Sequence, residues 1–308
     1  MNQEPRILIL QNIITSYKTA LFNELTKMLD GLEVAFIGVT EKRRDWTIDQ
    51  ANIQYSYTLL FNKAIDSVKQ LRIFKETWRL LNSKQPDILI LVGDYSNSFG
   101  WAGMLWGRKN RKKMGFWFDS TYADHKRHWY LEGAKKIFLR PFEFGITPGI
   151  KSKHYLELLG MNGSDISTTG YAVDNNFYLD QYRIHKENRQ YLIKEMNVSA
   201  RNFLFVGRFS PEKNIISLLK AYNNIIENNR EWGLILVGDG PEKPAISEFI
   251  RQNELEDRIH LPGFIQQSEI TKYYSVSNVM ILPSVSEPWG LVINEAMICG
   301  LPLIVSDR

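Results

Sequence analysis

The sequence is poor in the features that would place a protein outside the ordinary globular class. It has a single cysteine, Cys299, which excludes an internal disulfide bond and fits a reducing compartment. No apolar run approaches the roughly 20 residues that a membrane-spanning helix requires. The apolar segment Ile7–Leu10 is shorter than the core of a signal peptide, and we interpret it as a first strand.

The chain also lacks a strong excess of charge of either sign. Its 308 residues carry a formal net charge of +4, which is too small to indicate a nucleic-acid partner. Residues 1–185 hold 25 Lys and Arg against 19 Asp and Glu, whereas residues 186–308 hold 13 against 15. Because the chain is long enough for two domains of ordinary size, this asymmetry predicts two domains with different surfaces.

Strand and helix signals alternate along both halves, which predicts an α/β protein with a doubly wound parallel sheet in each half. We predict strands at Ile7–Leu10, Val34–Val39, Asp87–Val92, Gly115–Phe118, Phe144–Thr147, Asn202–Val206, Trp232–Val237, Arg258–Leu261, Val279–Leu282 and Leu303–Val305. The predicted helices are Thr19–Leu29, Ala64–Leu81, Asp180–Glu195, Ile215–Glu227, Glu242–Arg251, Glu269–Tyr274 and Leu291–Cys299. Residues 160–182 are less periodic, so we place the domain boundary at their end, between 1–182 and 183–308.

The stretch Ser286–Glu295 carries the strongest chemical signal in the chain. Glu287 lies in a loop after a predicted buried strand, with Pro288 and Gly290 favouring a sharp turn, and Glu295 lies on the helix that follows. Ligands of open α/β sheets bind at such strand ends, and a helix N-terminus suits a phosphate group. Carboxylates accept hydrogen bonds from sugar hydroxyls, so the pattern indicates a ligand that is both phosphate and polyol. Two solvated glutamates near a helix start are the alternative.

Two further strand ends carry possible phosphate chemistry. Arg208 and Lys213 lie five residues apart in a loop that opens a helix, a pairing that suits a diphosphate. Two solvated loop cations are the alternative interpretation. Gly238 and Gly240 match the first two glycines of a dinucleotide fingerprint, but Lys243 stands where the third glycine belongs. We therefore expect a tight turn there and no standard NAD site.

Taken in order, these three motifs resemble the C-terminal domain of the family 4 glycosyltransferases, which have the GT-B fold. Residues 170–175 are similar to the segment that precedes that domain in the family. The resemblance implies two Rossmann-like domains that face each other across a cleft. It makes residues 1–182 the acceptor-side domain and residues 183–308 the nucleotide-sugar domain. It also implies transfer of a sugar from a nucleotide diphospho-sugar, with retention at the anomeric carbon.

The resemblance also implies roles for single residues of this sequence. The expected donor-binding residues are Arg208 and Lys213 at the diphosphate, Gly238, Gly290 and Leu291 by their backbone near phosphate, and Glu295 at the nucleotide ribose. Glu287 corresponds to the glutamate that contacts the transferred sugar and is the first predicted catalytic residue. No cofactor and no metal are expected, because the sequence offers no convincing ligand cluster and the cations can act on the leaving diphosphate.

The sequence departs from the family pattern in three places. The loop Gln11–Lys18 has no glycine pair, and Asp119 stands where many members have a histidine. We predict that Asp119 orients an acceptor or donor hydroxyl as a second catalytic residue. His125 and His128 are nearby alternatives that are more typical of a polar surface loop. The chain also ends just after the strand Leu303–Val305, where the family continues with further helices, so we expect an incomplete, truncated second domain.

The aromatic stretch Phe99–Gly107 is followed by the basic stretch Arg108–Lys113, which suggests a possible peripheral contact with an anionic membrane. A core helix followed by a solvated loop is the alternative. The expected partners are a nucleotide sugar and a glycan or lipid-linked acceptor, in cell-surface polysaccharide synthesis. The expected location is the cytoplasm, with the inner face of the membrane as a second expectation. A sugar-nucleotide epimerase on the same fold and a non-catalytic nucleotide-binding fragment remain as alternatives.

Overall fold

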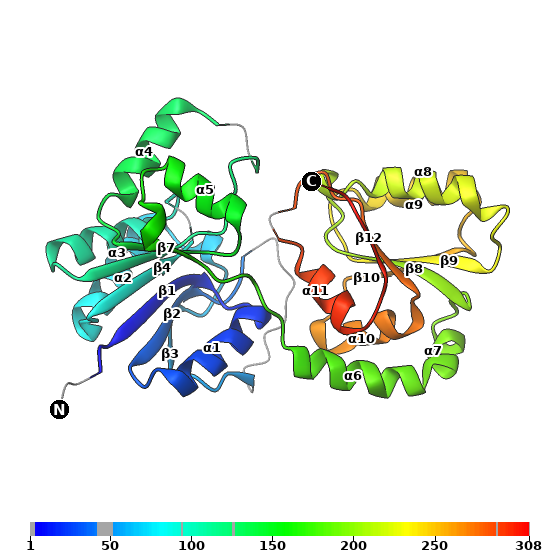
Figure 1. The fold of residues 1–308 in the computed structure, drawn as a ribbon, viewed down its shortest axis with the longest axis horizontal. Coiled ribbons are helices and arrows are strands. Elements are labelled where there is room, and N and C mark those ends of the chain that lie inside the picture. Colours follow the sequence, from blue (N-terminus) through cyan, green and yellow to red (C-terminus); the bar gives the residue numbers. More distant parts are fainter. Residues whose placement is uncertain (1–3, 42–51, 94, 125–126, 288, 308) are drawn as a thin grey trace. The chain divides into compact units, whose positions relative to one another are not determined.

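The chain folds into two compact units, each built around one parallel sheet (Figure 1). The computed structural model describes residues 4–41, 52–93, 95–124, 127–287 and 289–307. Unit 1 is Met1–Tyr171 and unit 2 is Ala172–Arg308. The boundary predicted after residue 182 falls inside helix α6 (Asn175–Glu187), which begins where the Asp174 carboxylate accepts a hydrogen bond from the Phe177 N–H at 3.0 Å.

Unit 1 contains a seven-stranded sheet in the order β3-β2-β1-β4-β5-β6-β7, with every described pair parallel. Its strands are β1 (Ile7–Ile13), β2 (Leu32–Gly38), β3 (Tyr57–Phe61), β4 (Ile88–Val92), β5 (Lys113–Trp117), β6 (Phe144–Thr147) and β7 (Ile166–Thr168). Its helices are α1 (Ser16–Met28), α2 (Gln70–Lys84), α3 (Ser98–Lys109), α4 (Trp129–Leu139) and α5 (Ile150–Leu158), with short 3₁₀ turns η2 (Ile65–Ser67) and η3 (Gly163–Asp165).

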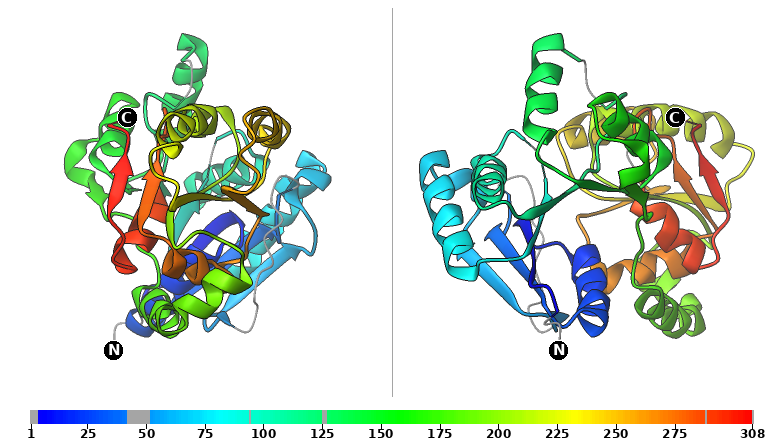
Figure 2. Two further views of the ribbon diagram at one scale, coloured as in Figure 1. Left: turned by 90° about the vertical axis from the view of Figure 1, so that its right-hand side faces the viewer. Right: turned by 60° about the vertical axis from the view of Figure 1, so that its left-hand side comes forward.

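The alternation of side chains along each strand produces two apolar layers in unit 1. On β1, Leu8 and Leu10 pack with residues of α2, α3, α4 and α5, whereas Ile9 packs on the other face with Phe22 of α1. Helices therefore cover both faces of the sheet (Figure 2). All four of these side chains are buried, and burial on both faces explains why the central strands read as continuous apolar runs.

Two predicted helices are divided in the structure, and two strands were not predicted. The helix predicted over Ala64–Leu81 is the 3₁₀ turn η2 followed by α2, because Val68 and Lys69 between them have extended backbone. The helix predicted over Asp180–Glu195 is also divided, into α6 and α7 (Arg189–Glu195), with the break at Asn188. Strands β3 and β7 were not predicted. They form the two edges of the sheet and are only partly buried. β7 has no apolar run, and the run of β3 is limited to Leu59–Phe61.

Unit 2 contains a five-stranded parallel sheet in the order β10-β9-β8-β11-β12. Its strands are β8 (Arg201–Val206), β9 (Trp232–Val237), β10 (Ile259–Gly263), β11 (Val279–Leu282) and β12 (Leu303–Val305). Besides α6 and α7 its helices are α8 (Ile215–Ile226), α9 (Lys243–Gln252), α10 (Gln267–Val276) and α11 (Leu291–Ile298), with the 3₁₀ turn η4 (Pro211–Lys213). Every strand predicted in this half is present, with ends that agree to within two residues.

The strand order of unit 2 fixes where a ligand can bind. From the central strand β8 the chain first adds β9 and β10 on one side, and then returns to add β11 and β12 on the other side (Figure 1). On β9, Leu234 and Leu236 pack under α8 and α9, while Ile235 and Val237 pack under α6, α10 and α11. With both faces covered, the open position is the edge where β8 and β11 end, which is the topological switch point of the sheet.

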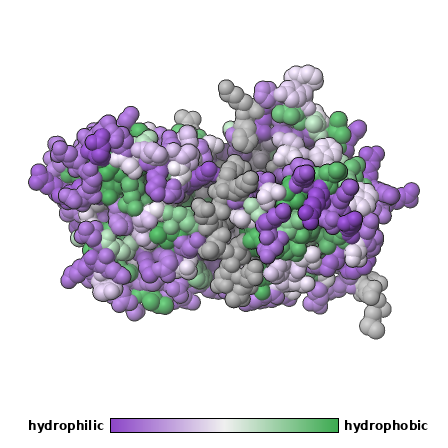
Figure 3. All heavy atoms as spheres, turned by 180° about the vertical axis from the view of Figure 1, so that it is seen from behind, coloured by the Kyte–Doolittle hydropathy of each residue, from purple (hydrophilic) through white to green (hydrophobic). Residues whose placement is uncertain are grey.

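The face of the molecule shown in Figure 3 is mainly hydrophilic, with exposed apolar side chains in small groups. The most exposed of these include Trp129 at 87%, Ile150 at 81% and Met28 at 79%. Within the described residues, every helix is too short or too polar to span a bilayer.

Candidate functional site

Arg208, Lys213 and Glu287 all lie in the two loops that flank the switch point of unit 2. Arg208 and Lys213 follow β8, and Glu287 follows β11, which pairs with β8. Parallel neighbours end at the same edge of a sheet, so the fold brings the predicted cations and the first predicted carboxylate together. The two loops are joined by a backbone hydrogen bond of 2.8 Å from the Val285 N–H to the Glu212 carbonyl.

Lys213 and Glu287 form an ion pair, which the sequence analysis did not predict. The Lys213 ammonium donates to the Glu287 carboxylate, and both side chains are largely buried, at 16% and 17% exposure. The Ser284 hydroxyl donates to the same carboxylate oxygen at 3.2 Å. Arg208 lies exposed nearby. Burial would raise the pKa of Glu212, but hydrogen bonds, first of all from Ser210, and the charges of Lys213 and Arg208 hold that pKa below its ordinary value. The predicted diphosphate cation and sugar carboxylate therefore neutralise each other.

Gly238 allows two loops of the site to approach closely. Its φ is +148°, and a Cβ atom there would lie 1.9 Å from the carbonyl oxygen of Gly207. The Gly207 N–H in turn donates to the Val237 carbonyl at 3.0 Å, so β8 and β9 end in contact. Lys243, which occupies the place of a third glycine, pairs with Asp239 at 2.5 Å. This geometry agrees with the tight turn that we expected, and a donor contact of Gly238 stays a prediction.

Gly290 sets the start of α11. It has left-handed backbone angles, φ 76° and ψ 58°, and its carbonyl accepts the Ile293 N–H at 2.8 Å. The first N–H groups of a helix have no partner within the helix, so Leu291 begins a segment that can bind an anion. A Cβ atom at Gly290 would lie 3.2 Å from Cγ of Glu287. The same glycine therefore starts the helix and leaves space for the Glu287 side chain.

Glu295 lies on α11, and two tyrosine hydroxyls are hydrogen-bonded to its carboxylate. Its carboxylate accepts a 2.7 Å hydrogen bond from the Tyr274 hydroxyl of α10 and another from the Tyr178 hydroxyl of α6. Burial raises the pKa of Glu295, and the two hydrogen bonds only partly oppose this effect. Burial and the neighbouring carboxylate likewise raise the pKa of both tyrosine hydroxyls. Sequence reasoning missed both tyrosines, because nothing in their local pattern separates them from core residues.

Cys299 lies beside the same carboxylate, but its thiol is unreactive. Its thiol is buried, and burial raises its pKa to about 12, with a further contribution from the charge of Glu295. The thiolate is the reactive form of cysteine, so this thiol is not a nucleophile at neutral pH.

Asp119, the second predicted catalytic residue, belongs to unit 1. It follows β5 and pairs with Lys18 of α1 at 3.8 Å, while 41% of its side chain remains exposed. Of the alternatives, His128 is an exposed side chain at the start of α4, stacked on Tyr130 with 5.6 Å between ring centroids. His125 and Pro288 lie outside the described residues.

Nothing in the described part of the chain gathers three or more His, Cys, Asp or Glu side chains in a way that could hold a metal ion. The edge of unit 2 instead offers two cations, two carboxylates and a helix N-terminus. Cations and backbone N–H groups can bind and stabilise a diphosphate, including one that leaves during group transfer. Carboxylates at the same edge can accept hydrogen bonds from sugar hydroxyls.

Comparison with known proteins identifies a family. Residues 189–308 match the sequence profile of the glycosyl transferases group 1. The alpha-monoglucosyldiacylglycerol synthase of Acholeplasma laidlawii is 30% identical over 292 residues, which cover 89% of this chain and 72% of that protein. These matches confirm the resemblance that the motifs of unit 2 predicted.

Solved structures give the fold. The Anabaena protein HepE, in complex with UDP and glucose, matches with a TM-score of 0.72 at 17% identity, over 98% of this chain and 81% of that protein. The UDP-GlcNAc 2-epimerase of Methanocaldococcus jannaschii matches with a TM-score of 0.62 at 14% identity, over 97% of this chain and 83% of that protein. The predicted GT-B fold class, with two Rossmann-like units, is confirmed. The chain belongs to the group 1 glycosyltransferases.

Proposed function

We propose that this chain is a retaining glycosyltransferase that moves a sugar from a nucleotide diphospho-sugar to a glycan or lipid-linked acceptor. The observation that carries the proposal is the placement of Arg208, Lys213 and Glu287 together at the switch point of unit 2. A diphosphate between a sugar and a nucleoside needs cations in the middle and hydrogen-bond acceptors at both ends. The loops after β8 and β11, with α11, offer that set.

Each residue has a role in the proposed reaction. Arg208 and Lys213 bind the diphosphate and stabilise the charge that it gains on leaving. The backbone at Gly290 and Leu291 adds N–H donors at the phosphate. Glu287 accepts from hydroxyls of the transferred sugar, and Glu295 from those of the nucleotide ribose. Under this scheme the site needs no metal and no further cofactor.

The first donor and acceptor to test follow from the relatives. HepE binds UDP and glucose, and the Acholeplasma relative is named for a glucosylated diacylglycerol. We therefore start with UDP-glucose and diacylglycerol, and extend the panel to other UDP-sugars, GDP-mannose and glycan acceptors. We place the reaction in the cytoplasm, in the synthesis of a polysaccharide or glycolipid of the cell surface. An epimerase would change the donor without any acceptor, so reactions lacking acceptor separate the two activities.

Replacing Arg208 by alanine should weaken the binding of UDP. Loss of one charge-assisted contact costs about 1.5–3 kcal/mol, or roughly 10- to 150-fold in Kd. The fold should survive, because an exposed loop cation contributes little to stability. Calorimetry with UDP measures the change, and Arg251→Ala, an exposed arginine on α9, is the control. Equal UDP affinity of the Arg208 variant and the wild type would show that Arg208 is not a donor ligand.

Replacing Glu287 by glutamine should separate binding from transfer. The variant loses the ion pair with Lys213, so the ammonium becomes available to the diphosphate and UDP binding is retained or becomes tighter. Transfer should fall at least about tenfold, because a charge-assisted bond to the sugar becomes a neutral one. Calorimetry and transfer rates are measured side by side, with Glu269→Gln on α10 as the control. A large loss of UDP affinity would assign Glu287 to the nucleotide instead of the sugar.

Replacing Glu295 by glutamine should have opposite effects on stability and on binding. Because burial raises the pKa of Glu295 above its ordinary 4.5, the folded protein binds this proton more tightly than the unfolded chain does. Its contribution to stability is complete below the unfolded-chain pKa and is lost as the pH rises through the folded pKa. The ligand-free variant should therefore melt at a higher temperature than the wild type at pH 7, while binding UDP more weakly.

The measurement is thermal unfolding between pH 4 and pH 8, with calorimetry on UDP at pH 7. The difference in melting temperature should shrink toward pH 4, where the wild-type carboxyl is also neutral. Glu248→Gln on α9 is the control, since that carboxylate is exposed. A Glu295 variant less stable than the wild type at pH 7 would contradict the assignment of burial as the cause of the raised pKa of Glu295.

We also propose a peripheral membrane contact through unit 1, at a place that differs from the one we expected. The aromatic side chains Phe99 and Trp106 of α3 are buried core residues, so they cannot touch lipid. Arg108, Arg111 and Lys112 instead line a groove with Arg140. Arg140 follows α4, whose exposed side chains include three large apolar ones, Trp129, Tyr130 and Ile137. Cations beside exposed apolar side chains suit an anionic bilayer surface.

Neutralising the groove should release the protein from anionic vesicles. The variant Arg108→Gln, Arg111→Gln, Lys112→Gln, Arg140→Gln should sediment less with phosphatidylglycerol vesicles than the wild type, and wild-type binding should fall as salt is added. The control neutralises four exposed cations of unit 2: Lys194, Lys220, Arg230 and Arg251. Equal sedimentation of both variants and the wild type would leave the basic stretch as a solvated loop.

A further inference from the structure

Three strand ends of unit 1 bring Lys18, Asp119 and Tyr171 together. Lys18 lies in the first turn of α1, which follows β1, while Asp119 follows β5 and Tyr171 follows β7. The Lys18 ammonium lies 3.8 Å from Asp119 Oδ2. The Tyr171 hydroxyl is hydrogen-bonded to Asp119, and burial followed by the charge of Asp119 raises the pKa of Tyr171. The carboxyl edge of unit 1 therefore holds a carboxylate between a cation and a phenol.

Lys18 stands where fold stability alone would disfavour a lysine. Its side chain is only 4% exposed, and its ammonium lies 5.0 Å from the ring centroid of Trp117. The first turn of a helix is the positive end of the helix dipole, where a cation is unfavourable, and α1 has no acidic residue there. A buried cation also loses its hydration. Residues that break such rules are expected at functional sites.

Asp119 keeps hydrogen-bonding capacity for a ligand. Its side chain is 41% exposed, although Oδ1 itself is buried and has no hydrogen-bond partner among the described residues. Buried polar atoms are normally paired with protein, water or ligand. The ring of Tyr17 meets that of Tyr171 edge-on, with 5.6 Å between centroids. The Asp119 carboxylate can accept hydrogen bonds from hydroxyl groups, and the two aromatic rings lie beside it. Together they form a surface that fits a sugar or another polyol.

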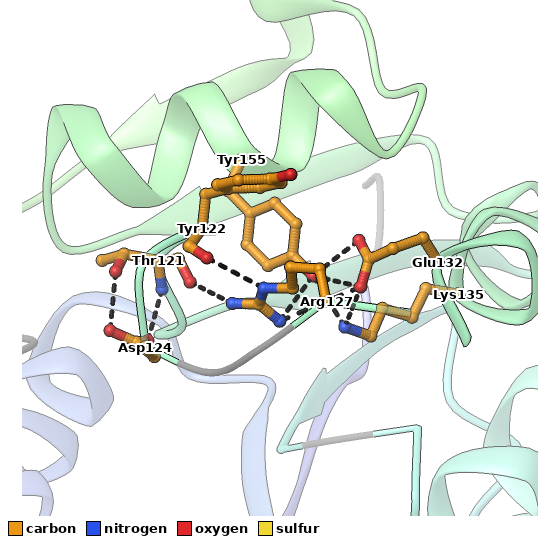
Figure 4. Close-up of polar contacts among 7 residues, drawn as sticks. All are labelled: Thr121, Tyr122, Asp124, Arg127, Glu132, Lys135 and Tyr155. Atoms are coloured by element: carbon orange, nitrogen blue, oxygen red, sulfur yellow. Dashed lines mark hydrogen bonds and ion pairs between the residues drawn. The ribbon is translucent and has the colours of Figure 1, made fainter. Parts of the chain in front are cut away.

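The segment after Asp119 is held in place by a polar network (Figure 4). Asp124 accepts from the N–H and the hydroxyl of Thr121, both at 2.6 Å. The Arg127 guanidinium donates to the carbonyls of Thr121 and Tyr122 and lies 4.4 Å from the ring centroid of Tyr155. The backbone around Asp119 is thus fixed before any ligand binds, as a preorganised site requires.

Glu132 anchors the far side of that network. Its carboxylate accepts from Tyr155 at 2.8 Å and from the buried Lys135 at 2.6 Å. Burial would raise the pKa of Glu132, but these hydrogen bonds outweigh it and hold the pKa below its ordinary value. The carboxylate is therefore ionised at neutral pH and tethers α4 to α5, the helix whose Ser152 hydroxyl donates to the Asp119 carbonyl at 3.3 Å.

We propose that Lys18 and Tyr171 are positioning residues that hold the Asp119 carboxylate to accept a hydrogen bond from a hydroxyl group of the acceptor substrate. The proposal rests on the proposed glycosyl transfer and adds the acceptor side to it. Lys18 fixes the direction of the carboxylate, while Tyr171 restrains it from the other side. Neither side chain needs to contact the reacting atoms.

The test compares Lys18→Met, Lys18→Arg and Tyr171→Phe with Lys27→Met, which removes an exposed lysine from the last turn of the same helix. Initial rates are measured with UDP-glucose and diacylglycerol, or with the active pair from the panel, from pH 5 to pH 8. Lys18→Met should lower kcat/KM for the acceptor at least tenfold and leave UDP affinity within twofold. Lys18→Arg should retain most activity.

A double variant separates positioning from general stability. If Lys18 acts through Asp119, adding Lys18→Met to Asp119→Asn should cause little further loss of kcat/KM. Additive losses, or a Lys18→Met variant that behaves like Lys27→Met, would overturn the inference while the proposed transfer stands. If Lys18→Met does not fold, Tyr171→Phe decides in the same way through its acceptor kcat/KM and its UDP affinity. A wild-type protein that binds UDP but transfers nothing to any acceptor would overturn the proposed function, and this inference with it.

Discussion

Parallel pairing of β8 with its two neighbours is the constraint on which the candidate site depends. In a parallel sheet every strand ends at the same edge, so the loops after β8, β9 and β11 meet although they are far apart in sequence. Gly238 allows two of those loops to touch, and the Val285 N–H ties the third to the first. The cations and carboxylates of unit 2 are gathered by this topology, not by their local sequence. The same rule gathers Lys18, Asp119 and Tyr171 in unit 1.

Opposite charges are paired in both units. Lys213 is paired with Glu287, and Lys18 with Asp119. A bare cluster of cations would repel itself and bind many anions, whereas a paired one presents little net charge until a ligand replaces one partner. Binding of a diphosphate at Lys213 is then an exchange of one anion for another. The favourable part of that exchange is the additional hydrogen bonding that the larger ligand makes.

The central strands and most site residues of unit 2 could be predicted from the sequence. A strand covered on both faces is an unbroken apolar run, and the polar residues that follow it mark the candidate site. The runs at Trp232–Val237 and Val279–Leu282 are strands with those bounds. The sequence was insufficient for the edge strands β3 and β7, which are short and only partly buried. It also could not predict that Tyr178 and Tyr274 hold Glu295, or that Lys18 meets Asp119. Those contacts depend on strand order and helix packing, which no single segment encodes.

The environment of Cys299 makes this chain well suited to labelling experiments. Its only thiol is buried and protonated at neutral pH, so maleimide reagents would leave it unmodified under mild conditions. A cysteine introduced at an exposed position of each unit, such as Lys27 and Arg251, would then carry a dye without interference. Energy transfer between the dyes would follow the separation of the two units in solution, with and without nucleotide. The native chain needs no cysteine removed for that measurement.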